Sequence, residues 1–414
     1  MTATLTLDLI GTGAGAFSIF QNSDNYASAV ATNVSSSSLL SGYSLTLDNA
    51  TTTVRVYSTG TCTNYKDISV NLGDTTPTFT YRGIQSLDTS TAPRDTNIAT
   101  DGKETVVVSS GPGAGGKTII SSNSGTSWTD ITNNLSNSYY GTIIMFNPAD
   151  GGGGAFYYAA SDATIKKHFL NNLGTFSTHT TDIALPGTDY VCGYFYHNNA
   201  YYIATNTELL RSTNNTNFTS VFTHTYGVNS KFLLDHLKGY GNTVYFSTGK
   251  EIAKSTDNGL NWTSLVSSNS TGNPIDNVYV ENANKVIYRD DTSNAYKYST
   301  NGGTSFSSSG FVPAGGPSSE ASTLIKYGPT YLHTAEYGTN YDRPAWTTTD
   351  PFSATSPTNN YIGTTQLNNP GSTSQYRTNV YNMKVLGKRL FLSGYLNTSS
   401  TGGTNVVYYD INSN

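Results

Sequence analysis

The sequence predicts an all-β protein in which a small β-sandwich precedes a β-propeller, a ring of four-stranded sheets. The 414 residues include 31 Tyr and 40 Gly. Aromatic and β-branched segments separated by Gly, Asn and Asp turns are typical of sheet proteins. An octapeptide also recurs along the chain with the period of one propeller blade. The length is that of two domains rather than one sandwich.

The recurring octapeptide occupies residues 121–128, 255–262 and 299–306, and fits Ser-x-Asp/Asn-x-Gly-x-x-Trp/Phe. In such a turn the Asp or Asn side chain accepts hydrogen bonds from its own backbone, and the Ser adds a second local bond. The Gly supplies a positive φ, and the aromatic residue packs under the turn. The pattern positions are Ser121, Asn123, Gly125, Trp128, Ser255, Asp257, Gly259, Trp262, Ser299, Asn301, Gly303 and Phe306.

Weaker copies at 171–176, 212–218 and 348–352 extend the repeat. Six markers, taken at Asn123, Asn172, Asn214, Asp257, Asn301 and Asp350, are separated by 49, 42, 43, 44 and 49 residues. These intervals match one four-stranded blade. The tail, 379–411, contains three further strand-like segments, and residues 81–87 are predicted to supply the fourth strand and close the ring. Seven blades is therefore the first prediction, with six as the alternative.

The octapeptide resembles the Asp box of sialidases and related propellers. The resemblance implies that each copy forms the hairpin between the third and fourth strands of a blade, away from the ligand face. It therefore implies a structural role for these residues. We expect the propeller to span residues 81–414, after a linker at 73–80 that contains Gly and Pro.

Residues 1–72 are predicted to form a small β-sandwich with the strand spacing of an Ig-like domain. Apolar residues alternate at 5–9, 54–56 and 68–70, further strands are expected at 17–20 and 43–47, and one helical turn at 39–42. Segments 11–17, 24–26 and 58–65 resemble small modules of bacteriophage virion proteins. That resemblance implies an attachment domain.

Composition argues against several functions. Charged residues make up 12% of the chain, the net charge is −5, and no basic stripe indicates nucleic-acid binding. No apolar run is long enough to insert into a membrane. The two cysteines, Cys62 and Cys192, fall in different predicted domains, so no disulfide framework is predicted. The six histidines show no metal-ligand spacing, and neither a metal nor another cofactor is predicted. Residues 111–118 match a P-loop pattern, but a strand-like segment follows, which predicts a hairpin loop.

The resemblance to sialidases implies a catalytic alternative with three arginines, a Tyr nucleophile assisted by a Glu, and an Asp acid/base. Arg94 departs from the family's Arg-Ile-Pro pattern, and we favour a polar loop for residues 336–343. If the protein is an enzyme, the candidates are Arg94, Arg343, Arg377, Glu336 and Tyr337. If it only binds a ligand, the candidates are Tyr337, Tyr341, Asp342 and Arg343.

The favoured hypothesis is a structural or adhesive protein of a bacteriophage virion, such as a tail, fibre or capsid-decorating component. It would contact other virion proteins through its N-terminal domain and a host-surface glycan or virion protein through the propeller, in multiple copies on a symmetric particle. The start of the chain lacks the basic flank and apolar block of a signal peptide, which favours assembly in the host cytoplasm. The alternatives are a sialidase-like glycoside hydrolase acting on surface polysaccharide, and a secreted, extracellular bacterial adhesin.

Overall fold

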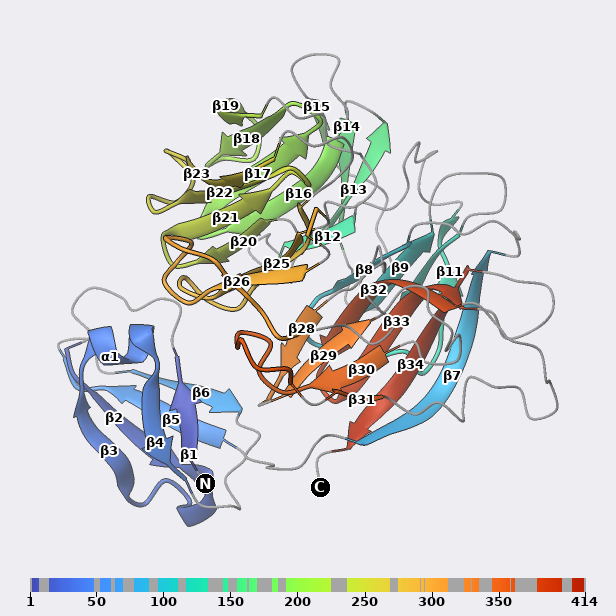
Figure 1. The fold of residues 1–414 in the computed structure, drawn as a ribbon. Helices are drawn as coiled ribbons and strands as arrows, with labels where there is room; N and C mark the ends of the chain where they lie inside the picture. The colour runs from blue at the N-terminus through green and yellow to red at the C-terminus, as the bar shows by residue number, and fades with distance from the viewer. Residues whose placement is uncertain are drawn as a thin grey trace. The chain divides into compact units, whose positions relative to one another are not determined.

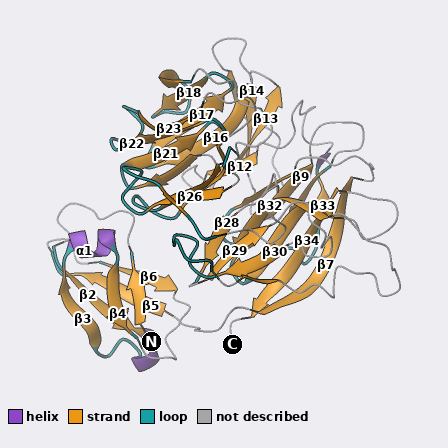
Figure 2. Ribbon diagram, viewed as in Figure 1, coloured by secondary structure: helices purple, strands orange, loops and turns teal. Residues whose placement is uncertain are grey.

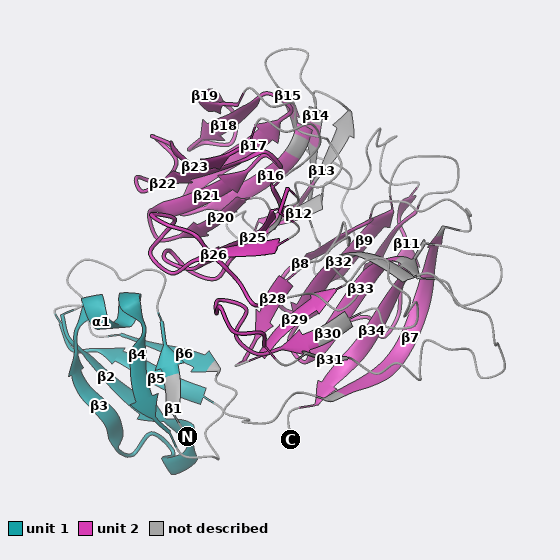
Figure 3. Ribbon diagram, in the orientation of Figure 1, with its two compact units in different colours: residues 1–77, 413–414 teal, residues 78–412 magenta. Residues whose placement is uncertain are grey.

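In a computed structural model, the chain separates into two compact units (Figure 3). Unit 1 comprises Met1–Pro77 with Ser413–Asn414, and unit 2 comprises Thr78–Asn412. The division falls inside the predicted linker, but a strand already begins at Thr78, so residues 78–80 belong to that strand. The structure describes residues 2–6, 15–47, 53–60, 64–69, 78–88, 96–110, 117–132, 144–147, 155–161, 164–169, 181–184, 191–224, 237–268, 275–290, 292–293, 295–311, 324–328, 330–334, 345–357, 359–361, 378–396 and 404–412.

The described part of unit 1 contains a four-stranded antiparallel sheet, ordered β3-β2-β5-β6, and a two-stranded sheet, β1-β4. Apolar side chains of both sheets share one core, with Leu5 and Leu45 from the small sheet packed near Ile19, Val54 and Val56 from the large one. The elements are β1 (Thr2–Leu5), β2 (Phe17–Gln21), η1 (Asn22–Asp24), β3 (Ala29–Val34), α1 (Ser36–Ser41), β4 (Tyr43–Thr46), β5 (Thr53–Ser58) and β6 (Tyr65–Ser69).

A short helix, α1, lies where the sequence predicts a helical turn, although it begins earlier, at Ser36. Ser35 caps it by accepting a hydrogen bond from the Ser38 N–H at 3.1 Å, as small hydroxyl residues do at helix starts. Leu39 is fully buried in the core between the sheets. Unit 1 is therefore a two-layer β structure, while its likeness to an Ig domain stays a prediction.

The described part of unit 2 contains seven four-stranded antiparallel sheets, here numbered I to VII (Figures 1 and 2). Sheet I contains β8 (Thr96–Thr100), β9 (Val106–Ser110), β10 (Thr118–Ser121) and β11 (Thr129–Asp130). Sheet II contains β12 (Ile144–Asn147), β13 (Ala155–Ser161), β14 (Thr164–Phe169) and β15 (Thr181–Ala184). Sheet III contains β16 (Val191–His197), β17 (Ala200–Thr205), β18 (Glu208–Ser212) and β19 (Thr219–Thr223).

The remaining sheets repeat the same pattern. Sheet IV contains β20 (Leu237–Tyr240), β21 (Thr243–Ser247), β22 (Glu251–Ser255) and β23 (Thr263–Ser267). Sheet V contains β24 (Ile275–Val280), β25 (Val286–Asp290), β26 (Ala295–Ser299) and β27 (Ser307–Ser308). Sheet VI contains β28 (Leu324–Tyr327), β29 (Thr330–Thr334), β30 (Ala345–Thr348) and β31 (Asn359–Tyr361). Sheet VII contains β32 (Thr378–Leu386), β33 (Arg389–Leu396), β34 (Thr404–Asn412) and β7 (Thr78–Asp88).

The core of unit 2 consists of apolar clusters between successive sheets. Seven clusters are present among the described residues of unit 2, and six of them join a sheet to the next one along the chain. The seventh joins the last sheet to the first, with Leu386 and Phe391 of sheet VII packed with Val106 and Ile119 of sheet I. First strands also meet across several junctions, including β8 with β12 and β32 with β8. The contacts between sheets therefore form a closed cycle.

Strand β7 completes sheet VII from the opposite end of the chain. It pairs antiparallel with β34, so that Tyr81 lies opposite Tyr409 and Ile84 opposite Val407. Figure 1 shows β7, in blue, along the edge of β34, in red. This pairing confirms the prediction that residues 81–87 supply the missing strand, and it hides the edge of β34 that would otherwise be exposed.

The recurring octapeptides, called repeat turns below, all lie between the third and fourth strands of a sheet. They connect β10 to β11, β22 to β23, and β26 to β27, as expected. Residues 111–116 of the P-loop-like segment lie outside the described residues, but Thr118 begins strand β10, which pairs with β9. The predicted strand after the Lys is therefore confirmed. No helix among the described residues is long and apolar enough to cross a membrane.

Candidate functional site

The residues predicted from the sequence to bind or react with a ligand all lie outside the described residues. They are Arg94, Glu336, Tyr337, Tyr341, Asp342, Arg343 and Arg377. The described strands that flank them are β7 and β8, β29 and β30, and β31 and β32. In an antiparallel sheet, successive connections alternate between the two ends of the strands. These flanking strand ends therefore lie on the face of unit 2 opposite the repeat turns.

Each repeat turn is held by its own side chains. The Ser hydroxyls of Ser121, Ser255 and Ser299 accept a hydrogen bond from the N–H of the Gly four residues later, at 2.7, 2.8 and 2.9 Å. The same hydroxyls donate to the Asn or Asp carboxamide or carboxylate oxygen two residues later, at 2.9, 2.7 and 2.8 Å. All three Gly residues have positive φ, between 78° and 88°. The local chemistry predicted from the octapeptide is therefore present.

The fourth position of each repeat turn, Ser124, Asn258 or Gly302, also has a positive φ and joins the turn to its own sheet. Its N–H donates to a carbonyl in the turn between the first and second strands, at 2.7–2.8 Å. The acceptors are the carbonyls of Glu104, Asn242 and Asn284. Both kinds of turn lie at the same end of the sheet, so this hydrogen bond ties them together.

The carbonyl of the fourth position accepts a hydrogen bond from a cationic side chain of the preceding sheet. Arg211 of sheet III donates to Asn258 at 2.9 Å, and Lys254 of sheet IV donates to Gly302 at 2.9 Å. Across the closure, Arg389 of sheet VII donates to Ser124 of sheet I. Hydrogen bonds from charged donors are stronger than neutral ones. We call this arrangement the cation bridge, because it links each of these repeat turns to the sheet before it.

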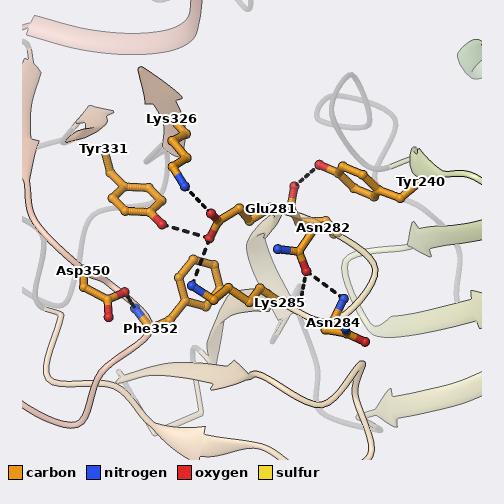
Figure 4. A network of polar contacts seen from close by, with 10 residues as sticks. Tyr240, Glu281, Asn282, Asn284, Lys285, Lys326, Tyr331, Asp350 and Phe352 are labelled. Carbon is orange, nitrogen blue, oxygen red and sulfur yellow. Dashed lines mark hydrogen bonds and ion pairs between the residues drawn. The ribbon is translucent and has the colours of Figure 1, made fainter. Parts of the chain in front are cut away.

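A denser polar cluster, the Glu281 network, joins sheets V and VI on this same face (Figure 4). Glu281 directly follows β24, and its side chain is only 10% exposed. Its carboxylate pairs with Lys326 of β28, accepts a hydrogen bond from the Tyr331 hydroxyl of β29 at 2.8 Å, and lies 3.6 Å from the Lys285 ammonium. Two sheets therefore supply the partners of one buried carboxylate.

The turn that carries Glu281 is fixed on both sides. From sheet IV, the Tyr240 hydroxyl donates to the Val280 carbonyl at 2.7 Å. Within the turn, Asn282 accepts hydrogen bonds from the Asn284 and Lys285 N–H groups at 2.9 and 3.0 Å. Figure 4 shows these contacts to the right of Glu281, with Lys326 and Tyr331 to its left. Such a turn holds the carboxylate in place without any ligand.

The electrostatics of the Glu281 network define what it can do chemically. Burial favours the neutral acid, but Lys326, Tyr331 and Lys285 outweigh it and hold the pKa of Glu281 below its ordinary value. Burial and the adjacent carboxylate raise the pKa of the Tyr331 hydroxyl well above its ordinary value. Tyr331 therefore remains a protonated donor. Its hydrogen bond to Glu281 joins sheet VI to sheet V.

Sequence reasoning did not find this network. Glu281 is separated from Lys326 by 45 residues and from Tyr331 by 50 residues, about one repeat. The available signal was an acidic residue directly after a first strand, followed one repeat later by a Lys and a Tyr on the first two strands of the next sheet. Among the described residues, no group of three or more His, Cys, Asp or Glu side chains could hold a metal ion.

Comparisons with solved structures show the fold. A streptogramin B lyase structure aligns over 80% of this chain and 98% of its own, with a TM-score of 0.52 and 10% identity. YCF48 bound to a D1 peptide aligns over 81% and 97%, with a TM-score of 0.51 and 11% identity. A chain of the mitotic checkpoint complex aligns over 83% and 95%, with a TM-score of 0.55 and 10% identity. These matches and the sheet pattern make unit 2 a β-propeller. No protein-family model matches the sequence, and no curated protein matches it.

Proposed function

We propose that this protein is a structural or adhesive component of a bacteriophage virion. Unit 1 attaches it to other virion proteins, and unit 2 is presented to a host-surface glycan or another virion protein. The observation that carries the proposal is the modular architecture, in which β7, the first strand after unit 1, seals the sheet at the far end of the chain. A propeller closed in this way pairs strands from the two ends of its own chain, with β7 covering the edge of β34. It is therefore suited to display on a separate attachment domain.

We further propose that unit 2 is a seven-bladed propeller whose repeat turns are Asp boxes. Seven four-stranded sheets in the described residues of unit 2 and a closed cycle of apolar clusters support the blade number. The shared hydrogen bonds of Ser, Asx and Gly between third and fourth strands support the Asp-box assignment. These turns then serve the scaffold and leave ligand binding to other residues.

The proposed ligand contacts are Tyr337, Tyr341, Asp342 and Arg343, between β29 and β30. The support is topological, because the ends of β29 and β30 lie on the face opposite the repeat turns, away from the cation bridges. Tyr side chains suit a glycan, since each offers a flat apolar ring and a polar tip at a low entropy cost. Many copies on one particle turn weak sites into useful avidity.

The test uses purified native particles of the source. We expect mass spectrometry to find the protein in gradient-purified particles, and antibodies against unit 2 to label intact particles in electron micrographs. A particle without the protein would refute the virion role. A glycan array with the full chain tests the ligand class, and Tyr337→Ala should weaken binding relative to the surface control Leu260→Ala.

The two alternatives make different predictions. A sialidase-like hydrolase would release sugar from surface polysaccharide, and Tyr337→Phe would abolish release while Leu260→Ala would not. A secreted adhesin would be recovered from culture medium rather than from particles. Neither alternative is favoured by an observation in the described residues, where Tyr331 donates a hydrogen bond to Glu281 in the joint between sheets V and VI.

A further inference from the structure

The outer face of the larger sheet of unit 1 carries a cluster of aromatic and charged side chains. Along β5, burial alternates, with Val54 and Val56 in the core and Arg55 and Tyr57 on the opposite face. The register places Asp67 of β6 opposite Arg55, and Tyr65 opposite Tyr57. Opposed residues of paired strands share a face. The cluster therefore belongs to the side of the sheet that faces away from the core of unit 1.

Arg55 is held rigidly within this cluster. Its guanidinium lies 4.1 Å from the ring centroid of Tyr26 and 4.0 Å from that of Tyr65, so both rings pack against it. It also donates two hydrogen bonds to the Asp67 carboxylate, from Nε at 2.7 Å and from Nη2 at 2.8 Å. A planar guanidinium fixed by stacking and by a bidentate pair is already ordered before any ligand arrives. We call this arrangement the Arg55 clamp.

The Arg55 clamp leaves polar and apolar groups accessible. Among the described residues, none accepts a hydrogen bond from Arg55 Nη1, and the Arg55 and Asp67 side chains are 28% and 38% exposed. Tyr65 is 55% exposed, one of the most exposed large apolar residues described. An N–H edge, carboxylate oxygens with spare lone pairs and an aromatic ring therefore lie together on one surface.

The charges of the clamp indicate the class of ligand. Arg55 and Asp67 neutralise each other, and the carboxylate would repel a phosphate or a carboxylate placed beside it. A neutral ligand with neighbouring hydroxyl groups fits better, because one hydroxyl accepts from the guanidinium while the next donates to the carboxylate. The exposed Tyr65 ring offers a flat apolar surface beside these groups. This combination is the chemistry of a pyranose, with hydroxyls at its edge and C–H groups on its face.

We propose that the Arg55 clamp is a binding site for a neutral saccharide, whose ring stacks on Tyr65 and whose neighbouring hydroxyls bond Arg55 and Asp67. This site goes beyond the proposed ligand contacts on unit 2, and it does not depend on the virion role. The two-stranded sheet β1-β4 lies across the core from it and leaves unit 1 another surface for attachment.

The test uses the full chain and a panel of methyl glycosides of glucose, galactose, mannose, rhamnose and N-acetylglucosamine, with inorganic phosphate and N-acetylneuraminic acid as anionic probes. Binding is measured by saturation-transfer NMR and by titration calorimetry. We expect at least one neutral glycoside to bind with a Kd of about 1 mM, which is typical of a small single-site ligand. Phosphate and N-acetylneuraminic acid should bind more weakly.

Variants separate the clamp from other sites. Tyr65→Ala should weaken binding about tenfold or more, since an exposed aromatic anchor is removed, while Tyr65→Phe should retain it. Arg55→Lys keeps the charge but loses the planar fork, and should also weaken binding. Leu260→Ala, on unit 2, is the matched exposed control. Absence of binding by every neutral glycoside, unchanged binding in Tyr65→Ala, or preference for an anionic probe would each overturn the proposal.

Discussion

Gly259 in the repeat turn between β22 and β23 is a position where a single added methyl group is expected to be strongly destabilising. Its φ is +78°, and a Cβ there would lie 2.5 Å from Cε1 and 2.7 Å from the hydroxyl oxygen of Tyr202. That hydroxyl donates to the Asn258 carbonyl at 2.7 Å, and Tyr202 is fully buried between sheets III and IV. Gly259→Ala must therefore displace a buried ring that cannot easily move.

The cost of Gly259→Ala has three parts. An L-residue in the left-handed region costs about 1–2 kcal/mol, overpacking a buried site costs about 1–3 kcal/mol, and losing the Tyr202 hydrogen bond costs about 1 kcal/mol. We expect a loss of about 3–6 kcal/mol in the free energy of unfolding. Gly387→Ala is the matched control, because its φ is +58° and no heavy atom lies within 4 Å of the added Cβ. It should cost only the backbone part, about 1–2 kcal/mol.

Thermal unfolding followed by tryptophan fluorescence and circular dichroism measures both variants. A domain of this size loses roughly 2 °C of Tm per kcal/mol. We therefore expect a fall of about 6–12 °C for Gly259→Ala and about 2–4 °C for Gly387→Ala. Equal shifts in the two variants would refute the reasoning, because they would mean that backbone strain alone, and not the contact with Tyr202, sets the cost.

Three further predictions concern charged groups of unit 2. Lys254→Met should lower the free energy of unfolding by about 1–2 kcal/mol in urea titrations, because it removes the donor to the Gly302 carbonyl, whereas Lys388→Met on the exposed turn after β32 should not. Asp257→Asn should keep the fold at pH 7, because Asn occupies this position in the other two repeat turns. Hydrogen bonds from Asn261, Ser255 and the Leu260 N–H hold the pKa of Asp257 well below its ordinary value. The contribution of the ionised Asp257 side chain to the free energy of unfolding is therefore fully present above the pKa of an unfolded Asp, about 3.9. It is lost as the pH falls below that value. The Tm difference between wild type and Asp257→Asn should shrink below about pH 4, and a constant difference down to pH 2 would contradict this. Glu281→Gln should cost about 1–3 kcal/mol at pH 7, because Lys326 and Lys285 lose their charged partner. Since the pKa of Glu281 is also lowered, that cost should decline below about pH 4, and a pH-independent cost would argue against an ionised Glu281.

The parts of the fold that could be predicted from the sequence are those held by hydrogen bonds between residues close together in the chain. In the repeat turns, Ser121, Asn123 and Gly125 bond one another within four residues, so a short pattern contains all of the partners. Ring closure was also predictable, because the tail provides three strands where a blade needs four. The segment 81–87 was the unassigned strand-like segment directly before the first blade.

The contacts between sheets could not be predicted in the same way. Arg389 reaches the Ser124 carbonyl across 265 residues of sequence, and no local pattern marks an Arg on a second strand as a partner of that turn. Glu281 likewise contacts Lys326 and Tyr331 only because sheets V and VI pack with one particular shift relative to each other. That shift depends on how the apolar cluster between the two sheets, which includes Ile287 and Tyr331, is packed. It is a property of packing and not of pattern.

The polar groups of the repeat turns have consequences for where a ligand can bind. At the fourth position of each of the three turns, the N–H is bonded to its own sheet and the carbonyl to a cation of the preceding sheet. A ligand that replaced Arg211, Lys254 or Arg389 at this carbonyl would leave a charge without its partner, which is costly. In the Glu281 network the carboxylate is similarly engaged by three donors from two sheets. At these three turns and in the Glu281 network, the described polar groups are therefore already engaged by partners within unit 2. The surfaces to test for recognition are the opposite face of unit 2 and the Arg55 clamp of unit 1.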